Sequence, residues 1–305
     1  MSRLFQTLVL LFIVVASSYS QVDFIAVEKD LAYHADIMVN VTVEDHRFKA
    51  ADLFREQFEV MLNTPDSYDH EFESLKWISK LVAADNSFRI FSWIVADADV
   101  VSKTYGYIQF ADGRVVKLND TGEMNTDLEY EQTDADNWFG AIYYNIMPAT
   151  SDSSSTDYIL MGYRQIAKFD KVKVLEVLSV NDGEITFGKE LFLKEVEGSR
   201  DEVRTRLLMT YSADANVTLN YNESMQMIVH DHLIPRMGRI EGQGPTQLPD
   251  GSFVGYKLEG DQWKYVDKLF NQTSATAPRP QPVLGNDKDK DIFGGSKTKK
   301  KKKRN

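Results

Sequence analysis

Two histidines in a predicted strand have the spacing in this sequence that best suits metal chemistry. His230 and His232 flank Asp231, and side chains two residues apart on a strand point to the same face of a sheet. Two imidazoles held in this way can bind one zinc ion, but a catalytic zinc site needs a third protein ligand. Asp231 would point to the opposite face. The other histidines fall in predicted helices: His34, His46 and His70.

The same residues also fit a strand end that holds no metal. In that interpretation the imidazoles of His230 and His232 hydrogen-bond to neighbouring loops, and Asp231 caps the turn before Pro235. A His-x-His pair with no closing motif does not define a metal site. We therefore assign no metal, no catalytic residue and no cofactor, and we keep His230 and His232 as metal candidates.

Paired carboxylates suggest glycoside hydrolysis as a second chemistry, because that reaction needs two acids facing a sugar. Asp97 with Asp99 and Asp134 with Asp136 are candidate pairs. Nothing in their spacing distinguishes them among the 46 acidic residues of the chain. Acids of turns and loops are the simpler interpretation.

An alternating acidic run near the C-terminus resembles the start of a calcium-binding loop. It contains Asp287, Asp289 and Asp291. The sixth loop position is Ile292 where the EF-hand needs glycine, and the twelfth is Thr298 where it needs glutamate. The run therefore fails as an EF-hand and is interpreted as linker.

The aromatic residues could form a stacking platform for a glycan, although in a β-rich chain they more often build the core. They are Trp77, Trp93, Tyr105, Tyr107, Trp138, Tyr143, Tyr144 and Trp263. The sequence has no HExxH, GxSxG, Walker A or dinucleotide-binding glycine pattern, and it has no cysteine nucleophile.

The N-terminus has the three parts of a secretory signal in the required order. A short region with Arg3 precedes the apolar run 8–16, and the small residues Ser18 and Ser20 suit signal peptidase. We predict residues 1–20 as the signal peptide, with cleavage between Ser20 and Gln21. The alternative is an N-terminal membrane anchor, but the run is about half of the ~20 residues that a spanning helix needs.

Composition favours a protein that works outside the cytoplasm. The net charge of −11 would repel nucleic acid, so we expect no nucleic-acid partner. The chain has no cysteine, whereas secreted eukaryotic domains usually carry disulfides, which favours a bacterial envelope protein. No other segment has membrane-spanning length, so we expect no integral membrane segment after signal removal.

Hydrophobic periodicity predicts an α+β protein that is mainly β. Residues 21–86 form the predicted helical region, with one helix through Phe48–Met61 and a second whose apolar face is Phe72, Leu75, Ile78 and Val82. These helices should form a hairpin packed on an antiparallel β domain over 87–270, as a sandwich, roll or partly open barrel.

Strand signals recur throughout the β domain, separated by Asp-Gly and Asn-Asp turns. A tight turn at residues 111–113 should join one hairpin, and residues 259–261 another. Residues 203–211, 216–221 and 225–229 should form a three-strand meander. Further strands are expected at 88–95, 138–147, 158–166, 171–180 and 184–187.

The C-terminal residues 271–305 are predicted to be a disordered tail. Pro278, Pro280 and Pro282 indicate an extended linker. Seven of the last nine residues are basic, and such a run repels itself. The tail could contact anionic surfaces such as lipid head groups or an acidic partner.

Three groups of segments in the β region carry a family resemblance: residues 88–93 with 106–109, 174–178 with 187–188, and 231–235 with 250–253. With them the chain resembles an uncharacterised family of secreted bacterial proteins with a helical N-terminal part and a β-rich remainder. The resemblance covers residues 25–270 and implies an envelope location without an assigned activity.

The sequence thus favours a non-enzymatic binding or structural module exported to the periplasm or cell surface, with an envelope protein or glycan as partner. Two alternatives remain open. One is a secreted hydrolase acting on a cell-wall or carbohydrate polymer. The other is an accessory subunit of an outer-membrane assembly, with the tail or the helical hairpin as its contact.

Overall fold

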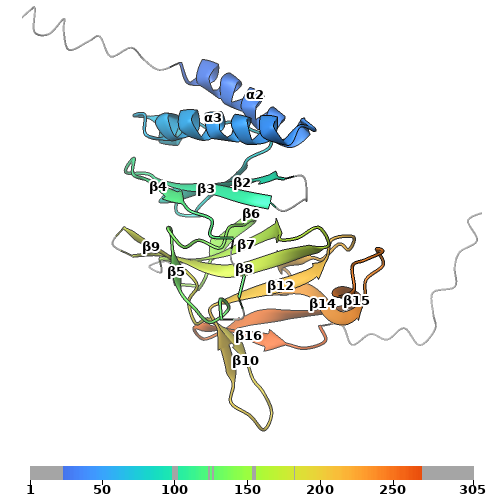
Figure 1. Cartoon of the computed structure of the whole chain (residues 1–305). Coiled ribbons are helices and arrows are strands. Elements are labelled where there is room, and N and C mark those ends of the chain that lie inside the picture. Colours follow the sequence, from blue (N-terminus) through green and yellow to red (C-terminus); the bar gives the residue numbers. More distant parts are fainter. Residues whose placement is uncertain are drawn as a thin grey trace, which may run out of the picture. The chain divides into compact units, whose positions relative to one another are not determined.

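The computed structural model describes residues 23–97, 102–122, 124–125, 127–152, 156–181 and 183–269. The predicted cleavage site at Ser20 and Gln21, the calcium-like run and the basic tail lie outside these residues. In the described residues two helices precede a series of antiparallel sheets, which confirms the predicted α+β, mainly β class (Figure 1). Neither helix is long and apolar enough to cross a membrane.

The helices α2 (Phe24–Asn40) and α3 (Glu44–Leu62) form the first layer. The Asp23 side chain accepts a hydrogen bond from the backbone N–H of Ala26 at 3.1 Å, which caps the N-terminus of α2. Glu44 and Asp45 place negative charge at the N-terminus of α3, where the helix dipole favours it. The short connection 41–43 makes the helices antiparallel neighbours. The predicted helix through Phe48–Met61 is confirmed as α3.

The first sheet is an antiparallel meander in the order β1-β2-β3-β4. Gly113 has a φ of 90°, which glycine adopts without strain, and it closes the predicted turn between the last two strands. The strands are β1 (Ser79–Val82), β2 (Phe88–Ala96), β3 (Ser102–Phe110) and β4 (Val115–Leu118).

The second sheet has the order β5-β9-β8-β7-β6, and β12 pairs with the first part of β8. Its neighbours are all antiparallel. The strands are β5 (Thr133–Asp134), β6 (Ile142–Pro148), β7 (Asp157–Gln165), β8 (Asp170–Asn181), β9 (Glu184–Phe187) and β12 (Arg206–Ser212).

The third sheet has the order β11-β10-β16-β15-β14-β13, and its β10–β16 pair is parallel. The predicted hairpin at residues 259–261 is confirmed as the turn between β15 and β16. The strands are β10 (Phe192–Lys194), β11 (Glu202–Arg204), β13 (Leu219–Asn222), β14 (Met227–Met237), β15 (Pro245–Glu259) and β16 (Gln262–Val266).

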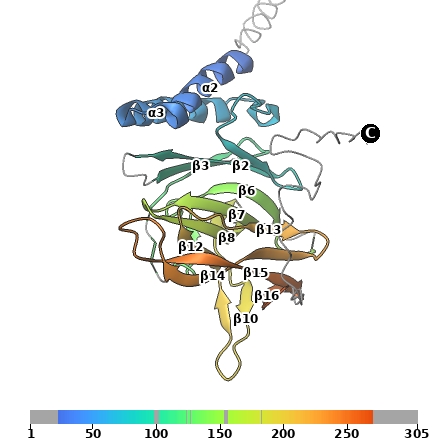
Figure 2. The same ribbon diagram turned by 90° about the vertical axis from the view of Figure 1, so that its right-hand side faces the viewer.

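The helix pair and the three sheets are stacked as layers (Figure 2). Three hydrophobic clusters lie between these layers. One joins the helices to the first sheet, one joins the first sheet to the second, and one joins the second sheet to the third. Strand β2 therefore has both faces buried, with Phe91 and Trp93 towards the helices and Phe88 and Ile90 towards the second sheet. Burial on both faces explains its almost continuous apolar sequence.

The predicted second helix over residues 67–84 is wrong. This segment contains a single 3₁₀ turn, η1 (Ser67–Asp69), followed by irregular chain and strand β1. The guanidinium of Arg89 donates to the carbonyls of Ser67 and His70, both at 2.6 Å, and the Lys80 ammonium donates to the carbonyl of Phe72 at 2.5 Å. Long-range side chains therefore take carbonyls that a helix would use internally.

The predicted meander over residues 203–229 is also wrong. Thr205 separates two strands, and its backbone N–H donates to the carbonyl of Glu129 at 2.8 Å. Strand β11, before Thr205, belongs to the third sheet, whereas β12, after Thr205, pairs with β8 in the second sheet. Only β13 and β14 remain as neighbours. The predicted strand over 138–147 is confirmed only from Ile142 onwards.

Candidate binding groove on the helical face

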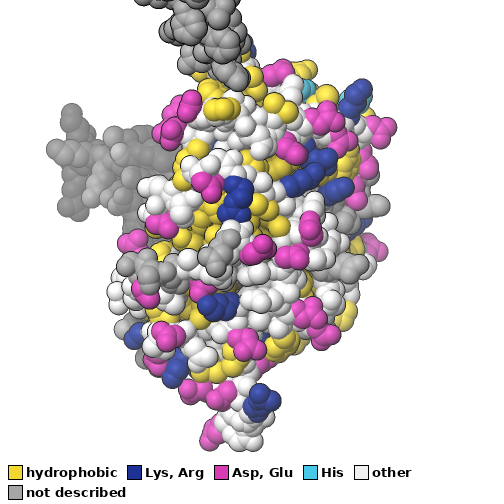
Figure 3. All heavy atoms as spheres, turned by 90° about the vertical axis from the view of Figure 1, so that its left-hand side faces the viewer, with side chains coloured by type: hydrophobic (Ala, Val, Ile, Leu, Met, Phe, Trp, Pro, Cys, Tyr) yellow, Lys and Arg dark blue, Asp and Glu magenta, His cyan; other side chains and the backbone are white. Residues whose placement is uncertain are grey.

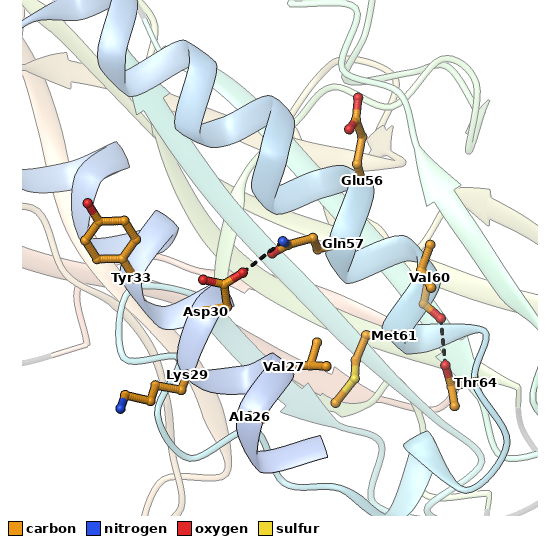
Figure 4. Close-up of a pocket in the computed structure, with 10 residues that line it drawn as sticks. All are labelled: Ala26, Val27, Lys29, Asp30, Tyr33, Glu56, Gln57, Val60, Met61 and Thr64. Atoms are coloured by element: carbon orange, nitrogen blue, oxygen red, sulfur yellow. Dashed lines mark hydrogen bonds between the residues drawn. The ribbon is translucent and has the colours of Figure 1, made fainter. Parts of the chain in front are cut away.

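A groove follows the seam between α2 and α3 on the face of the helix pair that is not packed on the first sheet (Figure 4). Its volume is about 890 Å³. Both helices contribute to the lining: Ala26, Val27, Lys29, Asp30 and Tyr33 from α2, and Glu56, Gln57, Val60 and Met61 from α3, with Thr64 just beyond it.

The groove combines an apolar floor with a charged rim. Val60 is 71% exposed and Tyr33 is 63% exposed, whereas Met61 in the same lining is buried. Lys29, Asp30 and Glu56 supply the charges of the lining. One cross-helix hydrogen bond spans the seam, from Gln57 Nε2 to Asp30 Oδ2 at 3.0 Å. The surface can therefore bind an apolar ridge that carries charged neighbours.

A second, smaller hollow of about 440 Å³ continues the seam beyond Tyr33, which lines both. Its apolar lining includes Ile37, Val41 and Leu53, and its polar lining includes His34, His46 and Lys49. Because Tyr33 belongs to both linings, the two hollows lie end to end along the helix pair.

Buried polar contacts fix the helix pair on the sheets. The carboxylate of Glu28, on α2, accepts from His70 Nε2 at 2.6 Å and from the backbone N–H of Ser74. The guanidinium of Arg47, on α3, donates twice to the carbonyl of Ala96, at 2.8 and 3.0 Å. It also donates to the carbonyl of Val41 in the turn between the helices. The groove is therefore a fixed feature of the fold.

The predicted metal candidates lie in β14, away from this groove, and each has its own partner. Nδ1 of His230 lies 2.9 Å from the backbone oxygen of Asp231, and Nδ1 of His232 lies 2.9 Å from Oδ2 of Asp250. The pairing of β14 with β15 shifts register between Asp231 and Leu233, so a bulge interrupts the alternation at His232. The described residues contain no group of three or more potential metal ligands.

Asp231, within β14, and Asp134 each accept hydrogen bonds from backbone N–H groups, and for Asp231 the donor lies before β13 and not in the predicted turn before Pro235. The Asp231 carboxylate accepts from the backbone N–H of Thr218 at 2.6 Å. Asp134 accepts from the backbone N–H groups of Asp136 and Asn137, the pattern of an Asx turn. Asp97 ends the described segment after β2, and Asp99 lies outside the described residues.

Most of the aromatic residues proposed as a glycan platform belong to the core. Trp93, Trp138 and Trp263 are buried, as are Tyr105, Tyr107 and Tyr143, and Tyr144 is partly buried. Trp77 is the exposed member, in the irregular chain before β1. A single exposed ring does not make a stacking surface of the kind that the sequence suggested.

His230 should make folding stability depend on pH. Burial lowers the pKa of His230 below its ordinary value of 6.5, so below that pH the unfolded chain binds the proton more readily. We expect the free energy of unfolding to fall as the pH drops below 6.5, and His230→Gln to reduce this loss. Urea denaturation at a series of pH values measures it, with His232→Gln as control. An unchanged pH profile in His230→Gln would contradict the prediction.

The predicted helical hairpin did not reveal the groove, because its second helix was placed after α3. In the structure the partner of α3 is α2, which precedes it. The available signal was α2 itself, where Ile25, Tyr33 and Val39 are apolar residues outside the buried stripe. Apolar residues outside the buried stripe of a helix indicate contacts on more than one face.

Similarity to known proteins would be independent evidence on function. The resemblance to a family of exported bacterial proteins remains an expectation from the sequence. Comparison of the chain with protein-family models, with curated proteins and with solved structures gives no match.

Proposed function

We propose that this chain is an exported, non-enzymatic binding or structural module of the cell envelope that docks a protein partner along the groove between α2 and α3. The exposure of Val60 and Tyr33 on that groove carries the proposal. The opposite face of the same helices is already covered by the first sheet. An exposed apolar strip with a charged rim is typical of interaction sites.

The lining favours a helical partner over a glycan. The two helices present an apolar seam, and amphipathic helices bind such seams through residues at helical spacing. The longer helix, α3, has 19 residues, so the seam is about 28 Å long. Tyr33 is the only aromatic residue among those that line the groove, whereas glycan platforms stack sugars on several rings.

The proposed location rests on the predicted N-terminal signal peptide and on the absence of cysteine from the sequence. We propose secretion to the periplasm or cell surface after cleavage before Gln21. The basic tail would add a contact with anionic surfaces, and the groove would supply specificity, because charge by itself gives association without a defined partner.

Photo-crosslinking in cells that export the chain tests the groove as the contact surface. p-Benzoylphenylalanine replaces Val60 in one variant and Val196 in another. Val196 is a matched control because it is also an exposed apolar residue, 37% exposed, and lies between β10 and β11. We expect a discrete adduct from position 60 that position 196 does not give.

A second substitution makes this test specific to the groove. Tyr33→Glu places a charge in the same seam and should abolish the adduct from position 60 without changing export. Equal adducts at both positions, or no adduct at position 60 in exported protein, would overturn the proposal. The N-terminus of the exported chain is read in the same samples, and any start other than Gln21 would contradict the predicted cleavage.

A further inference from the structure

The two ends of the groove carry opposite charge. At the end formed by the start of α2 and the finish of α3, the acidic residues Asp30 and Glu56 line the larger hollow, with Lys29 beside them. At the other end Lys49 lines the smaller hollow together with His34 and His46. Within the described residues Lys49 and Glu56 form no ion pair. Their charges are therefore available to a partner.

The two ends also differ in shape. Val60 projects from the larger hollow with 71% of its surface exposed. The smaller hollow is lined by apolar Ile37, Val41 and Leu53. Figure 3 shows hydrophobic side chains exposed among acidic and basic ones over the helical layer at the top of the molecule. A projecting side chain at one end and an apolar hollow at the other can fit each other.

Two-fold symmetry would bring these complementary ends together. Rotation by half a turn about an axis through the middle of the seam places the acidic end of one copy over the basic end of the other. Each contact then occurs twice, as it does in isologous dimers. Tyr33, which lies between the two hollows, would sit near the axis.

We infer that the occupant of the groove is a second copy of this chain, an inference that rests on the proposed role of the groove as the contact surface. In this dimer Val60 of each protomer enters the smaller hollow of its partner, and Glu56 of each faces the basic end of its partner. The four helices form a layer between two β-rich bodies. The partner helices supply the amphipathic surface that the groove requires.

The available area fits a reversible dimer. A helix pair about 28 Å long and about 20 Å wide offers roughly 560 Å² from each copy. The total is slightly below the range of about 1,200–2,000 Å² for standard interfaces and above most crystal contacts. We therefore expect a dissociation constant on the order of micromolar.

Sedimentation velocity on the purified exported chain, from about 1 to about 200 µM, tests the dimer. The wild type should shift from monomer to dimer across this range. Val60→Lys should weaken association by more than about tenfold, because it would bury a positive charge beside Lys49 in the smaller hollow of the partner. Val196→Lys, the matched control, should behave like the wild type. Both substitutions are on exposed side chains, and circular dichroism confirms that each variant is folded.

Charge reversal identifies the arrangement of the dimer. Lys49→Glu and Glu56→Lys should each weaken association, and the double variant should restore it, because the two-fold axis pairs the opposite ends. The residues are about 10 Å apart along one helix, too far to pair within a chain. A monomer at all concentrations, or a dimer insensitive to Val60→Lys, would overturn the inference. A groove-specific adduct with a different protein would overturn the dimer and leave the proposed function standing.

Discussion

Replacing Arg206 with methionine should lower the free energy of unfolding by about 3–5 kcal/mol. Arg206 and Glu176 are fully buried at the same register position of β12 and β8, with Nε and Oε2 3.1 Å apart. Removing the guanidinium leaves the Glu176 carboxylate buried without a countercharge. It also removes donors from the carbonyls of Leu128 and Phe187, at 2.9 and 2.8 Å. Urea denaturation measures the change.

Arg204 provides the matched control for that substitution. It lies two residues earlier and pairs with Glu129 and Glu202, but its side chain is 30% exposed. Arg204→Met should therefore cost less than about 1 kcal/mol, as expected for ion pairs at the surface. Adding Glu176→Met to Arg206→Met should recover part of the loss, because the unpaired charge is gone. Equal costs for Arg206→Met and Arg204→Met would contradict the prediction.

The tyrosine next to this ion pair belongs to the same buried network. The Tyr143 hydroxyl donates to Glu176 and accepts from Trp138 Nε1 at 2.7 Å. Burial, reinforced by the Glu176 carboxylate, raises the pKa of Tyr143 well above its ordinary value of 10.0. Tyr143 therefore stays neutral and serves as a hydrogen-bond donor to Glu176 within the core.

Local sequence patterns predicted single helices and hairpins of this fold better than they predicted which elements pack or pair with one another. Helix α3 and the hairpin between β3 and β4 follow from periodicity and one Asp-Gly turn, which act within a few residues. The segment 67–78 has the apolar spacing of a helix but is held open by Arg89, which comes later in the chain. The sheet change at Thr205 depends on Glu129, more than 70 residues away. Such long-range contacts leave no local signal.

The groove shows the same limit for function. Sequence reasoning concentrated on residues that bear chemistry, and placed His230 and His232 in a strand, where the structure has them. The bulge at His232 arises from the pairing of β14 with β15 and could not be read from three residues. The exposed strip on α2 and α3 consists of ordinary aliphatic side chains, so it becomes recognisable only once the sheet is seen to cover their other face.

Phe58 should decide whether the helical layer, and with it the groove, remains folded. It is fully buried, and its ring lies 5.0 Å from that of Phe91, 5.1 Å from Phe54 and 5.4 Å from Phe72. Phe58→Ala opens a cavity between α3 and the first sheet and should cost about 3–5 kcal/mol. Because this cluster is separate from the two others, the loss should be concentrated in the helical layer.

Hydrogen exchange followed by mass spectrometry resolves where the loss occurs. In Phe58→Ala we expect peptides from α2 and α3 to lose protection while those from β8 and β14 keep it, because layers with separate clusters can open separately. Leu53→Ala is the control on the same helix: Leu53 is 41% exposed, so its truncation should change stability by less than about 0.5 kcal/mol. Leu53 lines the smaller hollow, so this control should weaken self-association without loosening the helices. If all layers lost protection together in Phe58→Ala, the helices and sheets would form a single cooperative unit, and the helical layer could not open independently of the β layers.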